Sequence, residues 1–361
     1  MEKKKPFPKA LKVILKTVLG IVIAVVVLAV LALGALTALE YRPKDVEKVE
    51  APNGSTALET DREFTIMSYN TGYAGLGASE EFFMDGGNKT RADNKETVEG
   101  FMHGIAEELK AQNADIYILQ EVDTGSKRSY FIDETAYYKE ALGLPFDFAY
   151  NFNTFYLPYP IPDTMGKVKS GLATYTSYAV DSAERIQLPV PFSWPMRTMN
   201  LKRCLLINRL PVSGTDNELV LINLHLEAYD SGEGKIAQTK MLYDVITSEV
   251  AKGNYVIAGG DFNQTFPGAH LYEAVMDGLW MPGTLDDNLP EGFRFVFDEK
   301  GPTCRSLDRP YTGCENPQYY IIDGFIVSSN VNVTSLEVLD TGFANSDHRP
   351  LKLAFSLEGK E

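Results

Sequence analysis

The sequence predicts an α/β protein, a layered sandwich of mixed β-sheets with helices on the outside, preceded by one transmembrane helix. Short apolar and β-branched runs recur from Phe64 to the C-terminus, and two longer segments repeat apolar residues at three- and four-residue spacing. Runs separated by a few residues indicate antiparallel strands, whereas helical crossovers indicate parallel ones. Mixed sheets with outer helices are typical of a layered α/β domain.

The first element is an uncharged run of 23 residues at 17–39, rich in Val, Leu, Ala and Ile. About 20 apolar residues span a bilayer as a helix, whereas the apolar part of a signal peptide has about 7–15 residues. We therefore expect an uncleaved anchor; the small residues at Ala32-Leu33-Gly34 leave a cleaved signal as the alternative. Residues 1–16 hold six lysines, which predicts a single-pass cell membrane protein with a cytoplasmic N-terminus and the rest of the chain outside.

Residues 40–62 mix charges with Pro43, Pro52 and Asn53-Gly54, a pattern typical of a linker. Residues 63–361 are expected to form one catalytic domain, because its polar motifs run from position 70 to position 348. The net charge of −15 makes steering onto a polyanion unfavourable. Bound divalent cations would reverse the local sign, so nucleic acid stays open as a substrate.

Eight strands are expected, at 64–70, 116–121, 170–178, 204–212, 218–226, 255–261, 320–328 and 351–357. Helices are expected at 91–112, capped by Asp93 or Asn94, and at 234–251, ended by Gly253-Asn254. The segment 124–169 is expected to be a long loop rich in Tyr and Phe. We interpret it as the wall on the substrate side of the site, with packing of a secondary core as the alternative.

Polar side chains follow the apolar runs at the points where strands end. They are Asn70, Glu121, His225, Asp261, Asn263, Asp323, Asp347 and His348. Carboxylate and amide oxygens with imidazoles are the groups that hold a hard cation and activate a water molecule. Asp261 and Asn263 alternate along one strand end, so both face the same side, and glycines at 259 and 260 permit close approach of backbone or substrate.

In this order, the motifs Ser-Tyr-Asn, Gln-Glu-Val, His-Leu, Gly-Asp-Phe-Asn, Ile-Asp-Gly and Ser-Asp-His-Arg-Pro resemble the endonuclease/exonuclease/phosphatase superfamily over residues 64–357. The resemblance implies a four-layered α/β sandwich (DNase I-like) and phosphoester hydrolysis with a divalent metal. Val122-Asp123 replaces the Thr-Lys of apurinic endonucleases, and the Trp and Tyr-Arg signature of inositol 5-phosphatases is missing. The motif that begins at His225 is nearer the sphingomyelinase-like and DNase-like branches.

The resemblance also implies roles for these residues. Glu121 would be the main Mg²⁺ ligand with Asn70 and Asp347 beside it, and Mn²⁺ or Ca²⁺ are possible substitutes. The pair Asp261 and Asn263 would orient the attacking water. His348 would act as the base or as the charge partner of the phosphate, with Asp323 holding its imidazole, and His225 would contact the phosphate or protonate the leaving group.

Further basic residues are weaker predictions for contacts with the phosphate or headgroup: Arg91, Arg128 and Lys169, then Lys127 and Lys167. A solvated surface charge is the alternative for each. The remaining histidines, His103 and His270, are expected to lie outside the site. Cys304 and Cys314 flank a turn-rich stretch and would pair as a disulfide outside the cytoplasm, or stay as free thiols.

These predictions combine into a membrane-anchored, Mg²⁺-dependent phosphohydrolase, specifically a phosphodiesterase. The substrate is a phosphoester: a lipid headgroup, a nucleotide or a nucleic acid. A secreted or surface nuclease is the enzymatic alternative, and an inactive tethered binding module is the non-enzymatic one. No obligate protein partner is evident in the sequence.

Overall fold

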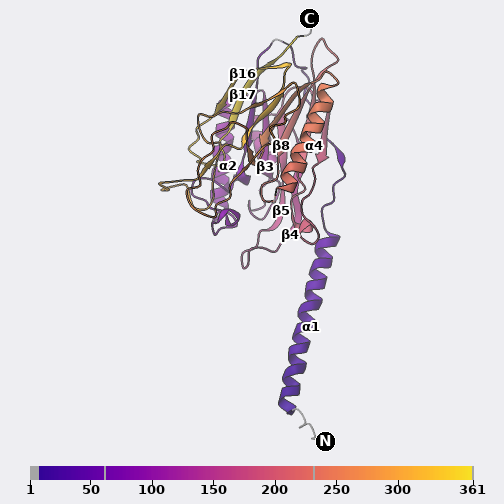
Figure 1. Cartoon of the computed structure of the whole chain (residues 1–361), viewed down its shortest axis with the longest axis vertical. Helices are drawn as coiled ribbons and strands as arrows, with labels where there is room; N and C mark the ends of the chain where they lie inside the picture. The colour runs from indigo at the N-terminus through magenta and orange to yellow at the C-terminus, as the bar shows by residue number, and fades with distance from the viewer. Residues whose placement is uncertain (1–7, 61, 231, 360–361) are drawn as a thin grey trace.

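Two β-sheets pack face to face in the computed structural model, which describes residues 8–60, 62–230 and 232–359 (Figure 1). One sheet has seven strands in the order β1-β6-β7-β8-β9-β15-β12, and the other has six in the order β16-β17-β2-β3-β5-β4. The strands of the first are Val46–Val49, Ser182–Gln187, Cys204–Pro211, Glu218–His225, Tyr255–Asp261, Asp323–Ser328 and Phe293–Val296. Those of the second are Val331–Val338, Leu351–Leu357, Phe64–Asn70, Ile116–Asp123, Gly166–Thr176 and Phe146–Leu157.

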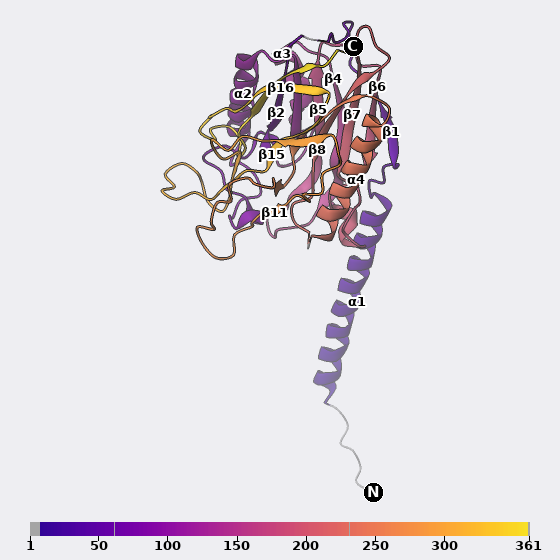
Figure 2. The same ribbon diagram turned by 45° about the horizontal axis from the view of Figure 1, so that its top comes forward.

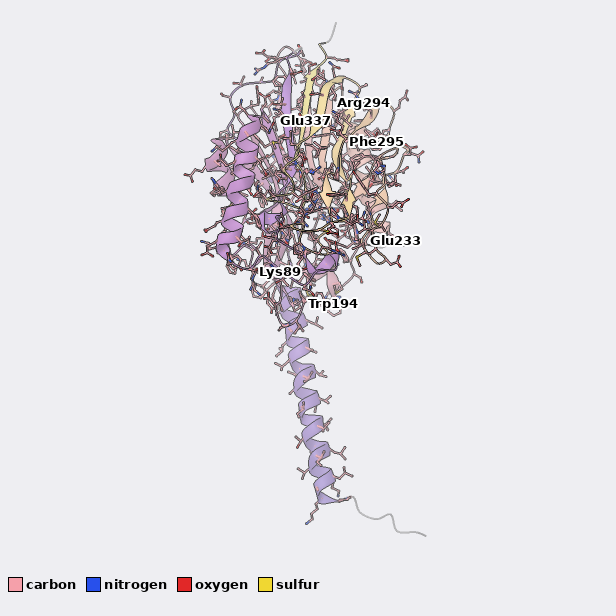
Figure 3. All side chains as sticks on the ribbon, turned by 90° about the vertical axis from the view of Figure 1, so that its left-hand side faces the viewer. Lys89, Trp194, Glu233, Arg294, Phe295 and Glu337 are labelled. Carbon is pink, nitrogen blue, oxygen red and sulfur yellow. The ribbon has the colours of Figure 1, made fainter. Side chains whose placement is uncertain are left out.

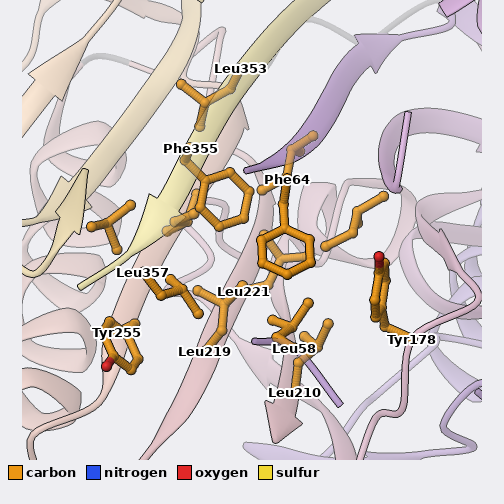
Figure 4. Close-up of a cluster of buried hydrophobic side chains, with 14 of the residues drawn as sticks. Leu58, Phe64, Tyr178, Leu210, Leu219, Leu221, Tyr255, Leu353, Phe355 and Leu357 are labelled. Atoms are coloured by element: carbon orange, nitrogen blue, oxygen red, sulfur yellow. The ribbon is translucent and has the colours of Figure 1, made fainter. Parts of the chain in front are cut away.

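Apolar side chains from the facing surfaces of both sheets form the central core. Phe64, Ile118 and Phe355 come from the six-stranded sheet, and Leu221 and Ile257 come from the seven-stranded sheet (Figure 4). All five are fully buried. Because every second residue of a strand points to one face, the other residues of the same strands are free to form outer cores.

Helices cover the outer faces of both sheets. The helices α2 (Lys95–Gln112) and α3 (Glu134–Leu142) pack on the six-stranded sheet, and α4 (Glu233–Val250) packs on the seven-stranded sheet (Figure 2). The order helix, sheet, sheet, helix is the four-layered sandwich that was expected. Helix α2 begins at Lys95 and not at 91, because the Asn94 side chain accepts a hydrogen bond from the Thr97 amide and caps the helix there.

The prediction of one long loop at 124–169 is wrong. This segment contains α3 and the 12-residue strand β4, which pairs with β5. Some of its aromatic residues pack in a core and others line a cavity, so each interpretation holds for part of the segment. Tyr138 of α3 packs in the core between the helices and the six-stranded sheet, whereas Phe152 lines a cavity. Strands β6 and β16 were also missed, because their sequences Ser-Ala-Glu-Arg-Ile-Gln and Val-Asn-Val-Thr-Ser-Leu-Glu-Val are rich in polar residues.

The prediction that residues 40–62 are a linker is also corrected by the structure. Strand β1 pairs with β6 at the edge of the seven-stranded sheet, and Leu58 is fully buried in the central core, bridged to Val212. Strand β1 and Leu58 therefore belong to the folded domain. Helix α1 (Lys9–Ala38) leaves one end of that domain as a single straight rod (Figure 1). It is long and apolar enough to cross a membrane, and none of its residues is buried.

Candidate active site

The predicted polar residues meet at one end of the sandwich because of strand direction. Strands β2 and β3 are parallel, as are β8 and β9, so their carboxyl ends lie on the same edge. Strand β15 runs antiparallel to β9, which places its first residue, Asp323, directly opposite Asp261. The edge opens into a cavity of about 580 Å³ that is lined by Glu121, His225, Asp261, Asn263, Asp347 and His348 among others.

Glu121 owes its position to a β-bulge in strand β3. The register with β5 shifts between Leu119 and Val122, and Glu121 itself has a φ of 56°. A positive φ is uncommon outside glycine, and a bulge turns a side chain away from its regular face. The carboxylate is 24% exposed, so it faces the cavity while its neighbours in the strand are buried.

Asn70 links the metal-side and water-side groups of the cavity. Its Nδ2 lies 3.3 Å from Glu121 Oε1, 3.0 Å from Asp261 Oδ2 and 3.4 Å from His348 Nε2. Its Oδ1 accepts a hydrogen bond of 3.0 Å from the backbone amide of Gly72. One buried amide therefore fixes the relative positions of three predicted site residues.

Asp261 is held from both sides and is buried. Its Oδ1 accepts the Asn263 amide at 2.8 Å, and the Asn263 side chain donates in turn to the Leu226 carbonyl at 2.9 Å. Burial raises the pKa of Asp261 to about 7, with His348 opposing that shift and Asp323 adding to it. A Cβ at Gly260 would meet the Leu224 carbonyl oxygen at 2.0 Å. This glycine therefore permits close approach of the neighbouring backbone, and not of substrate.

His348 and Asp323 form the expected pair. His348 Nδ1 lies 3.1 and 2.9 Å from the two Asp323 oxygens, and both residues are buried. Burial alone would lower the pKa of His348, but Asp323 and the other acidic groups around it raise that pKa well above its usual value. The Nε2 edge points at Asp261, 3.7 Å from its Oδ2. The surroundings of His348 therefore favour its protonated, hydrogen-bond-donating form.

His225 behaves in the opposite way although it lines the same cavity. Burial, and then the nearby Arg203, lower the pKa of His225 well below its usual value. Its Nε2 lies 3.5 Å from Asp261 Oδ2, and its buried Nδ1 has no hydrogen-bond partner. A neutral imidazole can still hydrogen bond to substrate, but it carries no proton to give away as a charged acid.

A family model described as the endonuclease/exonuclease/phosphatase family matches residues 67–348. The chain belongs to this family. It is therefore a metal-dependent phosphoric ester hydrolase, and the resemblance inferred from its motifs is confirmed. No curated protein matches the sequence.

Solved structures support the fold. A family member from Beutenbergia cavernae DSM 12333 is 17% identical with a TM-score of 0.55, and the match covers 83% of this chain and 72% of the other. A family member from Bacteroides vulgatus is 16% identical with a TM-score of 0.52, covering 82% and 100%. TDP2 from Caenorhabditis elegans is 17% identical with a TM-score of 0.51, covering 82% and 76%.

The residues at the strand ends fit the divalent metal of this family. Burial raises the pKa of Asp347 to about 6; His348 opposes this shift and the nearby Glu121 adds to it. A cation between Glu121 and Asp347 would relieve the repulsion between the two carboxylates. The Asn70 oxygen accepts a hydrogen bond from the Gly72 amide and has a second lone pair that a cation could use. His348 groups tightly with Asp261 and Asp323, and with Cys304 and Asp347, but a protonated imidazole is not a ligand.

The predicted basic contacts separate in the structure. Only Arg128 lines the cavity, where it donates to Asp123 at 2.9 and 3.1 Å and lies 3.8 Å from Glu121. Arg91 lies over the Tyr130 ring and Lys169 lies near the Tyr150 ring, both outside the cavity lining. Lys127 binds Asp163, and Lys167 is exposed.

Several cavity residues were not predicted. The buried pair of Arg203 and Glu227 lies beside His225, whose carbonyl accepts a 3.1 Å hydrogen bond from Arg203. In the sequence, Arg203 stands directly before strand β7 and Glu227 stands two residues after the end of strand β8. Cys304 also lines the cavity, and its backbone pairs with that of His348 in an isolated antiparallel β-bridge. Cys304 and Cys314 are both free thiols, so they do not form a disulfide.

Proposed function

We propose that the chain is a membrane-anchored, Mg²⁺-dependent phosphodiesterase that hydrolyses its substrate by in-line attack of water. The observation that supports this most is the convergence of Glu121, Asn70 and Asp347 with the Asp261–Asn263 and His348–Asp323 pairs around one cavity. Mg²⁺ prefers one or two carboxylates and keeps several waters, which suits this small ligand set.

Glu121 and Asp347, with the Asn70 amide, would hold the ion. When bound, the ion would neutralise phosphate oxygens and lower the barrier to attack. Across the cavity, Asp261 is the group that accepts a hydrogen bond from the attacking water, because Asn70 and the Asn263 amide fix its two oxygens. With a pKa of about 7, Asp261 can also take up a proton near neutral pH.

His348 acts as the charge partner of the phosphate in this scheme. The acidic groups around it raise its pKa and favour the protonated form, which suits a charge partner better than a base, and Asp323 keeps its ring in place. His225 stays neutral and contacts the phosphate or the leaving oxygen through a hydrogen bond.

The replacement Glu121→Gln tests the metal assignment. Turnover of bis-p-nitrophenyl phosphate would be measured with Mg²⁺, Mn²⁺ or Ca²⁺ and after chelation. We expect a loss of roughly 100-fold or more, because a charged ligand becomes neutral while the shape stays the same. The matched control Glu99→Gln changes an exposed carboxylate of α2 and should leave turnover intact. Near-normal turnover of Glu121→Gln at saturating Mg²⁺ would contradict the assignment.

Membrane anchoring through residues 17–39, with residues 1–16 in the cytoplasm and the domain outside, is the second part of the proposal. Helix α1 supports it by length and composition. Protease treatment of intact cells should digest the domain. Recovery of a protected domain in the membrane fraction would reverse the orientation.

A further inference from the structure

We infer that the substrate is a phosphoester carried by a membrane lipid, whose acyl chains lie in an apolar half of the active-site cavity that opens towards the bilayer. The inference rests on the proposed function, since it takes the membrane anchor and the hydrolytic site as given. It adds the substrate class and the direction from which the substrate enters.

A large part of the cavity lining is apolar. Phe152 and Met165 line it and form a cluster with Val168 behind them, with Phe82, Phe83, Leu157 and Leu201 packed against this cluster. Phe192, Met196 and Met199 continue this lining. A phosphate alone needs no such wall, whereas a ligand with a long apolar part is bound by burying it.

The apolar lining continues onto the surface at the cavity mouth. Tyr159 is 61% exposed and Met196 is 54% exposed, and both line the cavity. Next to them in sequence, Ile161 is 82% exposed and Trp194 is 53% exposed. Large apolar side chains gathered on an exposed rim are a feature of surfaces that contact a membrane or a partner.

Two segments carry this rim, the β4–β5 connection (158–165) and the 3-10 turn Met196–Met199, and both belong to the end of the domain that α1 leaves. The turn contacts both α1 and β4. The Trp194 indole donates to Thr37 Oγ1 in the last turn of α1 at 3.0 Å, and Figure 3 shows Trp194 where helix and domain meet. Tyr and Trp are enriched at membrane–water interfaces.

Ion pairs fix the domain relative to the helix at the same place. Glu40 follows α1 and its side chain is only 3% exposed, with Lys202 at 3.4 Å and Arg197 at 3.3 Å. Arg42 also donates to the Thr37 carbonyl at 3.1 Å. Helix α1 leaves one end of the domain (Figure 1), and if it spans the bilayer and is held this way, the rim residues at that end would stay at the membrane surface.

The basic residues of the cavity fit a lipid better than a nucleic acid. Arg128 is bound to Asp123, Arg203 is bound to Glu227, and Arg305 donates to the carbonyls of Leu76 and Gly77. The charges of Arg128 and Arg203 are thus paired with carboxylates inside the protein, and Arg305 directs donors at backbone carbonyls, in a chain of net charge −15. Affinity for a polyanion depends on cations that are available to its phosphates.

The experiment uses the full chain, with Mg²⁺, reconstituted into vesicles of phosphatidylcholine, sphingomyelin or phosphatidylglycerol. Each lipid is tested as a substrate by its released headgroup, and bis-p-nitrophenyl phosphate is the soluble substrate. The variant Ile161→Ser/Trp194→Ser removes two apolar side chains from the rim that lie outside the cavity lining. Its matched control, Ile161→Leu/Trp194→Phe, keeps them apolar.

We expect wild type to hydrolyse at least one lipid, and the serine pair to lose about tenfold or more of that rate because the rim no longer enters the bilayer. Turnover of the soluble substrate should stay within about twofold for both variants, which also shows that they are folded. The control pair should retain lipid turnover. Lipid placed in separate vesicles should be hydrolysed far more slowly than lipid in the vesicle that holds the enzyme.

The failures are distinguishable. Absence of turnover on both kinds of substrate would defeat the proposed function itself. Turnover of the soluble diester with no hydrolysis of any lipid would overturn the lipid inference alone. Lipid hydrolysis that the serine pair leaves unchanged would overturn the membrane-facing mouth.

Discussion

The two halves of the cavity are built in different ways. The polar half is formed by residues at or beside strand ends, and its geometry is set by hydrogen bonds such as those of Asn70 to Glu121 and Asp261. The apolar half is formed by β4, the start of β5 and the segments around them, and its lining is held by packing among Phe152, Met165 and Val168. Chemistry thus depends on the part of the fold with the least freedom, whereas substrate selection is left to segments that tolerate change.

The largest expected effect tests the polar half as a single unit. His348→Ala and Asp323→Ala should each reduce turnover by roughly 10²–10⁴-fold, the range for a positioned charged or acid–base group. The double variant should be little worse than the poorer single variant, because Asp323 acts through the ring that it holds. Steady-state rates on a soluble phosphodiester with all three variants decide the matter.

His225→Ala is the comparison for that cycle. It lies on a separate strand and, unlike His348, is not hydrogen bonded to Asp323, so its effect should combine with that of Asp323→Ala more nearly by multiplication than the effect of His348→Ala does. Losses that multiply fully for His348 and Asp323 would break the pairing, even if both residues proved essential.

The difference between the halves also explains what could be predicted from the sequence. Asn70, Glu121, Asp261 and His348 each stand in a short local motif beside an apolar strand, and parallel pairing then brings them together. The bulge that turns Glu121 into the cavity depends on the register with β5, which no local pattern encodes.

The apolar half has no such motif. Strand β4 alternates imperfectly and its aromatic residues serve two different cores, so the segment was expected to be a loop. Arg203 and Glu227 pair across two strands, which their separate positions in the sequence do not reveal. Contacts between distant segments, and not local propensity, decide this half of the site.

A change in the apolar half should act on binding and spare the chemistry. Phe152→Ala shortens the apolar wall, so the KM for a soluble phosphodiester with a long alkyl chain should rise about tenfold, the scale for losing part of one buried aromatic contact. The turnover number for bis-p-nitrophenyl phosphate should change little. A fall in that turnover number with an unchanged KM would show that the two halves are not separable.

The polar half should also make the metal-free protein sensitive to pH. Because the pKa of Asp261 is raised to about 7 from an unfolded value of ~3.9, the unfolded chain ionises first as pH rises, and stability falls between about pH 4 and pH 7. Asp261→Asn should remove part of this slope and stabilise the chelated protein at pH 8 by about 1–3 kcal/mol. Thermal melting in detergent at pH 4 and pH 8 measures it; equal slopes for both proteins would contradict the assignment.

The smallest effect is expected at the far end of the sheet, where Arg209 of β7 binds Glu249 at the end of α4 at 2.7 Å. Burial alone would raise the pKa of Glu249, but hydrogen bonds from Arg209 and its neighbours lower it to about 2. The pair therefore stabilises the fold above the unfolded pKa of ~4.3, and this contribution is lost as pH falls towards 2. Glu249→Gln should cost about 1 kcal/mol at pH 7, since Arg209 is partly solvated, and almost nothing near pH 2.

Turnover should not change in Glu249→Gln, because this end of the sheet is where β8 begins and the cavity is where it ends. Asp244→Asn, which alters an exposed pair with Lys240 on the same helix, is the matched control and should shift stability by less than about 0.5 kcal/mol. A loss of activity in Glu249→Gln at unchanged stability would mean that the far end of the scaffold is coupled to the site, and the contrast drawn between chemistry and scaffold would then be wrong.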